Sequence, residues 1–175
     1  MALFTRNETV QSERIFDGQI IGLRLDTLKH PTGKGATREV VEHNGGVVIA
    51  CQPEPNSVIL IRQYRYPVDQ VLIELPAGRI DGKEDPLLAA QRELREETGY
   101  NAKSWTELVR MYTAPGFCDE ILYLYKAYEI DFVGKCLDED EETDVFIATL
   151  EEARDLVRQG KVKDAKTIAG LSLLG

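Results

Sequence analysis

The feature that most constrains the fold is a helix signal over residues 86–98, with strand-like segments on both sides. Asp85 is a favourable N-cap, and Pro86 fits the first helical turn because its missing N–H has no partner there. Gly99 supplies the left-handed residue at which helices commonly end. A helix delimited in this way between strands predicts an α/β or α+β sandwich, in which helices pack against sheets.

The same helix carries three glutamates on one face. Glu93, Glu96 and Glu97 follow the i, i+3, i+4 spacing, which places their carboxylates side by side. Arg92 pairs with Glu96 at i, i+4, but one arginine does not balance three carboxylates. Two interpretations remain open: a solvated acidic face, or a site for a hard divalent cation such as Mg²⁺, which prefers oxygen ligands.

The rest of the chain is rich in strand signals. Short runs within residues 10–42 alternate apolar and polar positions between turn signals, and they predict a small N-terminal antiparallel β-sheet. We expect two domains, an N-terminal β extension over 1–42 and a main domain over 43–175. Core strands are predicted at 47–51, 58–61 and 71–75, further strands near 105–112 and 120–130, and helices at 149–160 and from 164 to the C-terminus.

Composition excludes several classes of function. The chain has 30 acidic and 21 basic residues and a net charge of −9, which disfavours general binding to nucleic acid or to membrane surfaces. It contains no apolar run long enough to span a membrane. Three cysteines without a C-x-x-C pair indicate neither a zinc site nor a disulfide framework, and they favour a reducing, cytoplasmic compartment.

Residues 78–100 match the pattern G-x5-E-x7-R-E-U-x-E-E-x-G-U, where U is a bulky apolar residue. Its fixed positions are Gly78, Glu84, Arg92, Glu93, Glu96, Glu97 and Gly99. Chance gives such a match in roughly one of 10^5 chains of this composition. The chain therefore resembles the Nudix hydrolase family. The resemblance implies an α/β/α sandwich with a mixed central sheet, in which residues 78–100 form a loop–helix–loop.

The resemblance also implies roles for these residues. The implied metal ligands are Glu93, Glu96, Glu97 and the carbonyl of Ala77. Glu84 would assist the metal cluster, and Arg92 would orient Glu96, so that Arg92 and Glu96 count as catalytic residues. Gly78 lies at a bend that aims the helix and is assigned to the substrate site. The implied cofactor is Mg²⁺, for which Mn²⁺ can substitute.

Pro115, 16 residues beyond Gly99, resembles the position of a proline that marks the ADP-ribose pyrophosphatase branch of the family. The resemblance to this branch extends over residues 13–172. It implies that Arg65 contacts the pyrophosphate and that Arg38 contacts the nucleotide. Taken alone, such arginines are as readily surface charges. Pro115 and Glu120 are assigned to the same substrate site.

The general base is less clearly marked. The acidic run 138–142 precedes a predicted strand at 145–146, and the resemblance implies that one of its glutamates activates the attacking water. Glu141 matches best and Glu139 second. His30 and His43 are the alternative bases, each placed at a strand end.

These assignments predict Mg²⁺-dependent hydrolysis of ADP-ribose to AMP and ribose 5-phosphate. The alternatives are hydrolysis of another nucleoside diphosphate sugar, such as GDP-mannose or ADP-glucose, and a Nudix module that senses ADP-ribose without cleaving it. The resemblance further implies a homodimer in which the N-terminal strands complete the substrate site. We expect no nucleic-acid or membrane partner.

Overall fold

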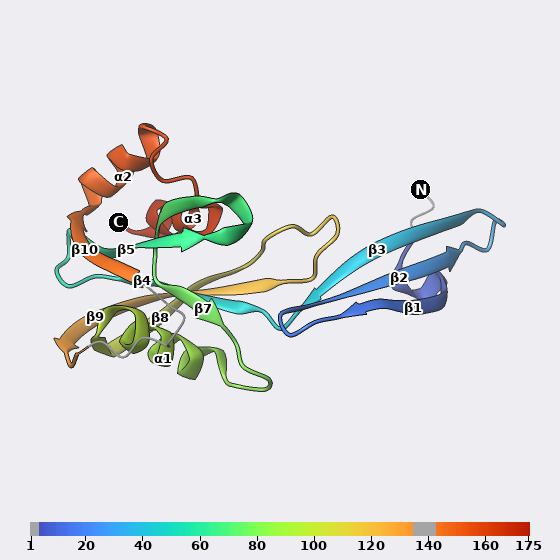
Figure 1. Cartoon of the computed structure of the whole chain (residues 1–175), viewed down its shortest axis with the longest axis horizontal. Helices are drawn as coiled ribbons and strands as arrows, with labels where there is room; N and C mark the ends of the chain where they lie inside the picture. The colour runs from blue at the N-terminus through green and yellow to red at the C-terminus, as the bar shows by residue number, and fades with distance from the viewer. Residues whose placement is uncertain (1–3, 135–142) are drawn as a thin grey trace. The chain divides into compact units, whose positions relative to one another are not determined.

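The computed structural model describes residues 4–134 and 143–175, and the chain divides into two compact units. The first unit contains residues 1–45 together with 112–121, and the second contains 46–111 and 122–175. Figure 1 shows the elements of both units. The roles in dimerisation and in the substrate site that the sequence assigns to residues 1–42 stay predictions.

The first unit is built on an antiparallel sheet with the order β1-β2-β3. Its strands are β1 (Thr9–Asp17), β2 (Ile21–Lys29) and β3 (Gly35–His43), after a 3₁₀ turn at Arg6–Glu8. The segment 112–121 joins the end of β3 through its backbone. The N–H of Val41 donates to the carbonyl of Phe117 at 2.7 Å, and the N–H of Asp119 donates to the carbonyl of Val41 at 3.1 Å. The N-terminal antiparallel sheet is thus present as predicted.

The second unit contains two sheets. One is mixed, with the order β7-β4-β9-β8, because β4 runs parallel to β9 and antiparallel to β7. The other is antiparallel, with the order β10-β5-β6, and a 3₁₀ turn at Tyr66–Val68 joins β5 to β6. The strands are β4 (Gly46–Cys51), β5 (Ser57–Arg65), β6 (Gln70–Glu74), β7 (Ala77–Arg79), β8 (Tyr100–Tyr112), β9 (Ile121–Phe132) and β10 (Thr143–Thr149).

Strand β4 is buried on both faces, which explains its uninterrupted apolar sequence. Its alternate side chains point to opposite sides of the sheet. Val47, Ile49 and Cys51 pack in one cluster with residues of α1 (Pro86–Thr98). Val48 and Ala50 pack in the other cluster with residues of α2 (Leu150–Arg158) and α3 (Ala165–Leu173). Helices therefore cover both faces (Figure 1), and the predicted α/β/α architecture is confirmed.

The helix ends follow their capping residues. The Asp85 side chain accepts a hydrogen bond from the N–H of Leu87 at 2.9 Å, and Gly99 has a left-handed φ of 78°, so α1 has the predicted limits. Thr149 and Glu152 form a capping box at the start of α2, where the predicted helix begins. That helix ends at Arg158 rather than at Gly160, because Gln159 is its C-cap and Gly160 follows with a φ of 68°.

Helices α1, α2 and α3 contain 13, 9 and 9 residues. Across residues 4–134 and 143–175, none of the helices combines the length and apolar character that crossing a lipid bilayer requires.

Candidate active site

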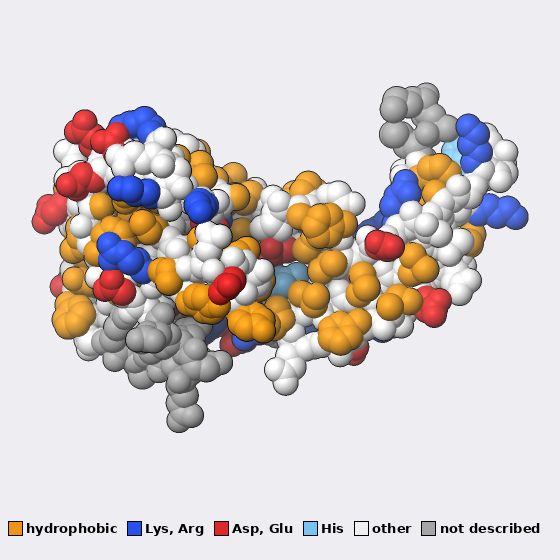
Figure 2. Space-filling view, turned by 45° about the horizontal axis from the view of Figure 1, so that its top comes forward, with side chains coloured by type: hydrophobic (Ala, Val, Ile, Leu, Met, Phe, Trp, Pro, Cys, Tyr) orange, Lys and Arg blue, Asp and Glu red, His pale blue; other side chains and the backbone are white. Residues whose placement is uncertain are grey.

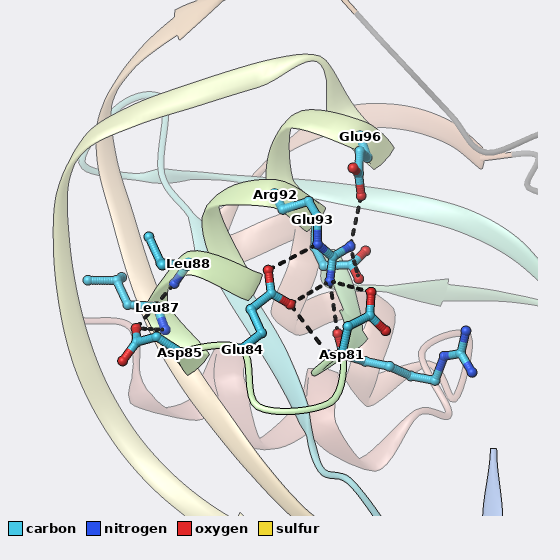
Figure 3. Close-up of polar contacts among 9 residues, drawn as sticks. Asp81, Glu84, Asp85, Leu87, Leu88, Arg92, Glu93 and Glu96 are labelled. Carbon is cyan, nitrogen blue, oxygen red and sulfur yellow. Dashed lines mark hydrogen bonds and ion pairs between the residues drawn. The ribbon is translucent and has the colours of Figure 1, made fainter. Parts of the chain in front are cut away.

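Arg92 of α1 donates hydrogen bonds to three carboxylates. Its Nη1 donates to Glu93 Oε1 at 2.8 Å and to Glu96 Oε2 at 2.9 Å, while Nε and Nη2 donate to the two oxygens of Glu84 at 3.3 and 3.1 Å. Figure 3 shows these contacts converging on the one guanidinium. The ion pair between Arg92 and Glu96, predicted from helical spacing, is present. Glu84 reaches the same group from the loop before α1.

These contacts shift the pKa values of Arg92 and Glu84 in the direction that favours their charged forms. The hydrogen bonds to Glu84 raise the pKa of Arg92, and the negative charge of Glu93 raises it further. The hydrogen bonds from Arg92 lower the pKa of Glu84, and a hydrogen bond from the N–H of Asp81 lowers it further. Arg92 therefore acts as a fixed positive charge that holds carboxylates from the loop and from the helix together.

Glu97 and Glu93 connect α1 to strand β7. Glu97 is buried, and its Oε2 accepts a hydrogen bond from the N–H of Ala77 at 2.9 Å. Glu93 lies against Gly78, where an added Cβ would come within 1.8 Å of the Glu93 Cδ. Only glycine therefore allows the backbone of β7 to approach this carboxylate so closely. The segment 77–78 and two of the predicted metal ligands thus form one packed group.

The donor atoms of this group are of the kind that binds a divalent cation, although their side chains do not converge on one point. Among residues 4–134 and 143–175, no three Asp, Glu, His or Cys side chains converge closely enough to hold a metal ion. The carboxylates are instead directed to Arg92 and to Ala77. Because every available donor is an oxygen and Glu93 and Glu97 are buried acids, the chemistry fits a hard cation. The ligand roles of Glu93, Glu96, Glu97 and Ala77 stay predictions.

Arg65 lies at the end of β5 and is paired with a residue to which the sequence assigned no role in the site. Its Nε and Nη2 each donate at 2.8 Å to one oxygen of Glu74, at the end of β6. The Glu74 side chain is only 1% exposed and also forms an ion pair with Lys166 of α3. The sequence signal for this pairing is the glutamate that directly follows the apolar residues 71–73. Contact of Arg65 with pyrophosphate stays a prediction.

The other predicted substrate residues belong to the first unit. Arg38 on β3 and Pro115 in the segment 112–121 line one cavity of about 280 Å³, together with Phe4 and Phe117. The guanidinium of Arg38 lies 5.9 Å from the centre of the Phe4 ring. The structure therefore brings these two residues to one hollow of the first unit, although their contact with substrate stays a prediction.

Glu120 lies beside one of the two histidines that the sequence offered as alternative bases. Its Oε1 is 3.3 Å from His43 Nδ1, and the same nitrogen accepts a hydrogen bond from the N–H of Gly45 at 3.0 Å. The Nδ1 atom of His43 is therefore engaged by these two groups. Nδ1 of His30 is likewise occupied, at 2.8 Å from the hydroxyl of Thr32.

The predicted general base falls outside the described part of the chain. Glu141 and its alternative Glu139 lie within residues 135–142, which the structure does not describe. Thr143, the first described residue after them, donates its hydroxyl to the backbone carbonyl of Glu97 at 3.0 Å. Strand β10 therefore begins next to the end of α1.

Comparison with known proteins agrees with this geometry. The family model for the NUDIX domain matches residues 42–171, so the chain belongs to the Nudix family. This confirms the family and the hydrolase class that the sequence predicted. Members of this family generally use a divalent metal ion.

Individual relatives extend over most of the chain. It is 39% identical to an ADP-ribose pyrophosphatase of Bacillus subtilis, over 95% of the chain and 91% of the relative. It is 35% identical to a methanol dehydrogenase activator of Bacillus methanolicus, over 99% of the chain and 95% of that relative. A solved structure described as an ADP compounds hydrolase shares the fold, with a TM-score of 0.83 and 23% identity, over 94% of this chain and 90% of that one.

Proposed function

We propose that the chain hydrolyses the pyrophosphate bond of ADP-ribose to AMP and ribose 5-phosphate, with Mg²⁺ as its metal and Mn²⁺ as a possible substitute. The observation that carries this proposal is the group of carboxylates that Arg92 and β7 hold on α1. The similarity to a B. subtilis ADP-ribose pyrophosphatase over nearly the whole chain supports the choice of substrate.

Each residue of the group has a defined task in this proposal. Glu93, Glu96 and Glu97 would hold the cation, which supplies charge neutralisation for the diphosphate when it is bound. Arg92 orients Glu96 through the hydrogen bond at 2.9 Å, and the Ala77 N–H orients Glu97. Such partners matter because a ligand with a fixed orientation binds without first losing rotational freedom.

Two further tasks complete the reaction. Arg65 would bind the diphosphate through its guanidinium, which suits paired phosphate oxygens. The proton of the attacking water is assigned to Glu141, with Glu139 as the alternative, because a carboxylate within hydrogen-bond reach of that water is needed. In this scheme the glutamates of α1 would hold the cation that neutralises the diphosphate, and the segment before β10 would supply the general base.

A substrate panel tests the proposal. ADP-ribose, ADP-glucose and GDP-mannose are each incubated with the enzyme and Mg²⁺, and nucleoside monophosphate release is followed by chromatography. We expect the highest kcat/KM for ADP-ribose and no turnover in chelator. A preference for GDP-mannose would instead favour the alternative substrate, and tight binding without cleavage would favour the sensing module.

We also propose a homodimer that uses the N-terminal sheet. Several large apolar side chains of this sheet and its first turn are exposed, among them Val10, Ile15, Phe16 and Ile20, each by more than half. Hydrophobic side chains are visible over this part of the chain in Figure 2. Apolar groups gathered on one surface are typical of an interface. Light scattering at micromolar concentration is expected to give twice the mass of the chain, and a monomer would contradict the proposal.

A reducing, cytoplasmic compartment is the proposed location. Cys51 is a free, buried thiol whose pKa burial raises to about 12, which is typical of an inert structural cysteine. Cys118 is also a free thiol. Fractionation of the source cells tests this location, and recovery of the protein outside the cytoplasm would contradict it.

The relative from B. methanolicus supports a second candidate function, activation of an alcohol dehydrogenase. The similarity covers 99% of the chain, and that protein's name describes it as an activator of methanol dehydrogenase. The test is the rate of that dehydrogenase with and without the chain. A rise in rate would support this function, and an unchanged rate would exclude it for that partner.

A further inference from the structure

Glu74 is a buried carboxylate that the chemistry described above does not use. It ends β6, and its side chain is 1% exposed. Both of its oxygens accept from Arg65, in the two parallel N–H···O bonds that fix a guanidinium most firmly. Burial works to raise the pKa of Glu74, but the hydrogen bonds from Arg65 and the charge of Lys166 lower it, so the carboxylate is ionised.

The first turn of α3 holds Glu74 in place from the other side. Lys166 forms ion pairs with Glu74 Oε2 and, at 3.0 Å, with Asp164. Thr167 is fully buried, accepts a hydrogen bond from the N–H of Leu75 at 2.8 Å and donates to Asp164 at 2.5 Å. The backbone next to Glu74 and its carboxylate are therefore both fixed by residues that lie about ninety positions later in the chain.

Arg65 keeps unused donors on the side away from Glu74. A guanidinium has five N–H groups, and only one on Nε and one on Nη2 point to Glu74. Within the described residues, Nη1 donates no hydrogen bond. The negative charge of Glu97 acts on the same guanidinium and contributes to its raised pKa, after the hydrogen bond to Glu74. The guanidinium of Arg65 thus lies within the electrostatic field of Glu97, one of the predicted metal ligands.

We propose that Glu74 is a positioning residue that, together with Lys166, aims the free edge of Arg65 at the diphosphate of the substrate. The inference rests on the proposed function, because it takes a diphosphate compound as the ligand. Two positive side chains beside one buried carboxylate leave the carboxylate no freedom to turn. The bidentate pair therefore fixes the plane of the guanidinium, on which the direction of its remaining donors depends.

Stability alone gives little reason for such a pair. Ionised groups lose hydration when they are buried, and an apolar pair of equal volume commonly stabilises a fold as well or better. The ion pairs of Glu74 also lie at the ends of β5 and β6, and Leu75 and Pro76 lead directly to Ala77. A charge network at this position therefore contributes more to the orientation of site residues than to the stability of the core.

Binding of a diphosphate ligand tests the proposal without depending on turnover. Isothermal titration calorimetry in Mg²⁺ buffer measures the Kd of α,β-methylene ADP-ribose for wild type, Glu74→Gln, Arg65→Ala and the double variant. We expect Glu74→Gln to weaken binding about 10-fold and Arg65→Ala about 30-fold, because charge-assisted contacts are of this strength. The double variant is expected to match Arg65→Ala at about 30-fold, because Glu74 acts only through Arg65.

Independent effects would give about 300-fold in the double variant, and that result, or an unchanged Kd in Glu74→Gln, overturns the proposal. Failure of wild type to bind the analogue overturns it as well. If wild type binds but hydrolyses no compound of the panel, the proposed function fails while the positioning role is still decided by the Kd values. The free energy of unfolding is measured in parallel, since a merely structural role would lower it without this pattern in Kd.

Two further variants secure the experiment. Where Glu74→Gln does not fold, Glu74→Gln with Lys166→Met removes both buried charges, and the same weakening and the same match to Arg65→Ala are expected. Lys163→Met is the control, because Lys163 donates a hydrogen bond to Gln70, at the exposed end of β6, at 3.0 Å and forms no hydrogen bond or ion pair with Glu74 or Arg65 among the described residues. Its Kd is expected to stay within about twofold of wild type, as for a surface contact. A larger change would overturn the assignment to Glu74 and Lys166.

Discussion

Glu97 Oε2 accepts a hydrogen bond from the N–H of Ala77 at 2.9 Å, which ties the last turn of α1 to the first residue of β7. The Ala77 N–H finds its partner in a side chain twenty positions later, while Ile49 donates to the carbonyl of the preceding Pro76 at 2.8 Å. Ala77, whose carbonyl is one predicted metal ligand, is thus held at its N–H by the side chain of another predicted ligand. Changes at either residue should affect the site before they affect the fold.

Glu97→Gln is expected to separate activity from stability. The glutamine oxygen still accepts from the Ala77 N–H, so the free energy of unfolding should change by less than about 1 kcal/mol. Loss of the negative charge should lower kcat/KM for ADP-ribose at least about 100-fold, because a cation ligand is removed. AMP release and urea unfolding measure the two effects. Full activity in this variant would refute the metal assignment.

The matched control is Glu107→Gln on β8. Glu107 is a glutamate at the exposed surface, where it pairs with Arg110. Its substitution is expected to leave kcat/KM unchanged.

Gly78→Ala should also damage activity more than stability. The new Cβ would lie 1.8 Å from the Glu93 Cδ, so the Glu93 carboxylate has to move. Because the displaced atoms belong to a flexible side chain, the fold should lose less than about 2 kcal/mol, while kcat/KM falls about 10- to 100-fold. Gly35→Ala, whose Cβ meets only ordinary contacts, is the control. Equal activity of the two variants would show that the position of Glu93 does not matter.

The ion pair of Glu84 predicts a specific acid sensitivity. The pKa of Glu84 lies below its ordinary value of 4.5, chiefly because of the hydrogen bonds from Arg92. Between the folded and the unfolded pKa, the unfolded state binds more protons, so this contribution to stability is lost as the pH falls. In urea unfolding between about pH 5 and pH 3, wild type should lose stability more steeply than Glu84→Gln. Identical slopes would contradict the role of this pair.

Local sequence signals predicted much of the fold. Asp85 and Gly99 delimit α1, and Thr149 marks the start of α2, because capping depends on side chains only a few residues away. The apolar run 47–51 correctly predicted a core strand, and the structure buries that strand on both faces. The ion pair between Arg92 and Glu96 followed from helical spacing alone.

What escaped prediction depends on distant partners. The pairing of Arg65 with Glu74 needs the register of β5 and β6, and the contact with Lys166 joins residues 92 positions apart. The union of 112–121 with the N-terminal sheet is made by backbone groups of Val41, Phe117 and Asp119 and by the Asp119 side chain, which accepts from the N–H of His43. Which residues meet there depends on the distant segments and carries no local signal. Local sequence patterns predict single helices and strands, whereas these contacts form only when the helices and strands pack together.

The central claim is that the carboxylates of α1 bind divalent cations. Crystals grown with Mn²⁺ and α,β-methylene ADP-ribose, measured at the manganese absorption edge, test it directly. An anomalous peak in contact with carboxylate oxygens of Glu93 and Glu97 is the predicted result. A map without such a peak, although the analogue is bound, would contradict the account.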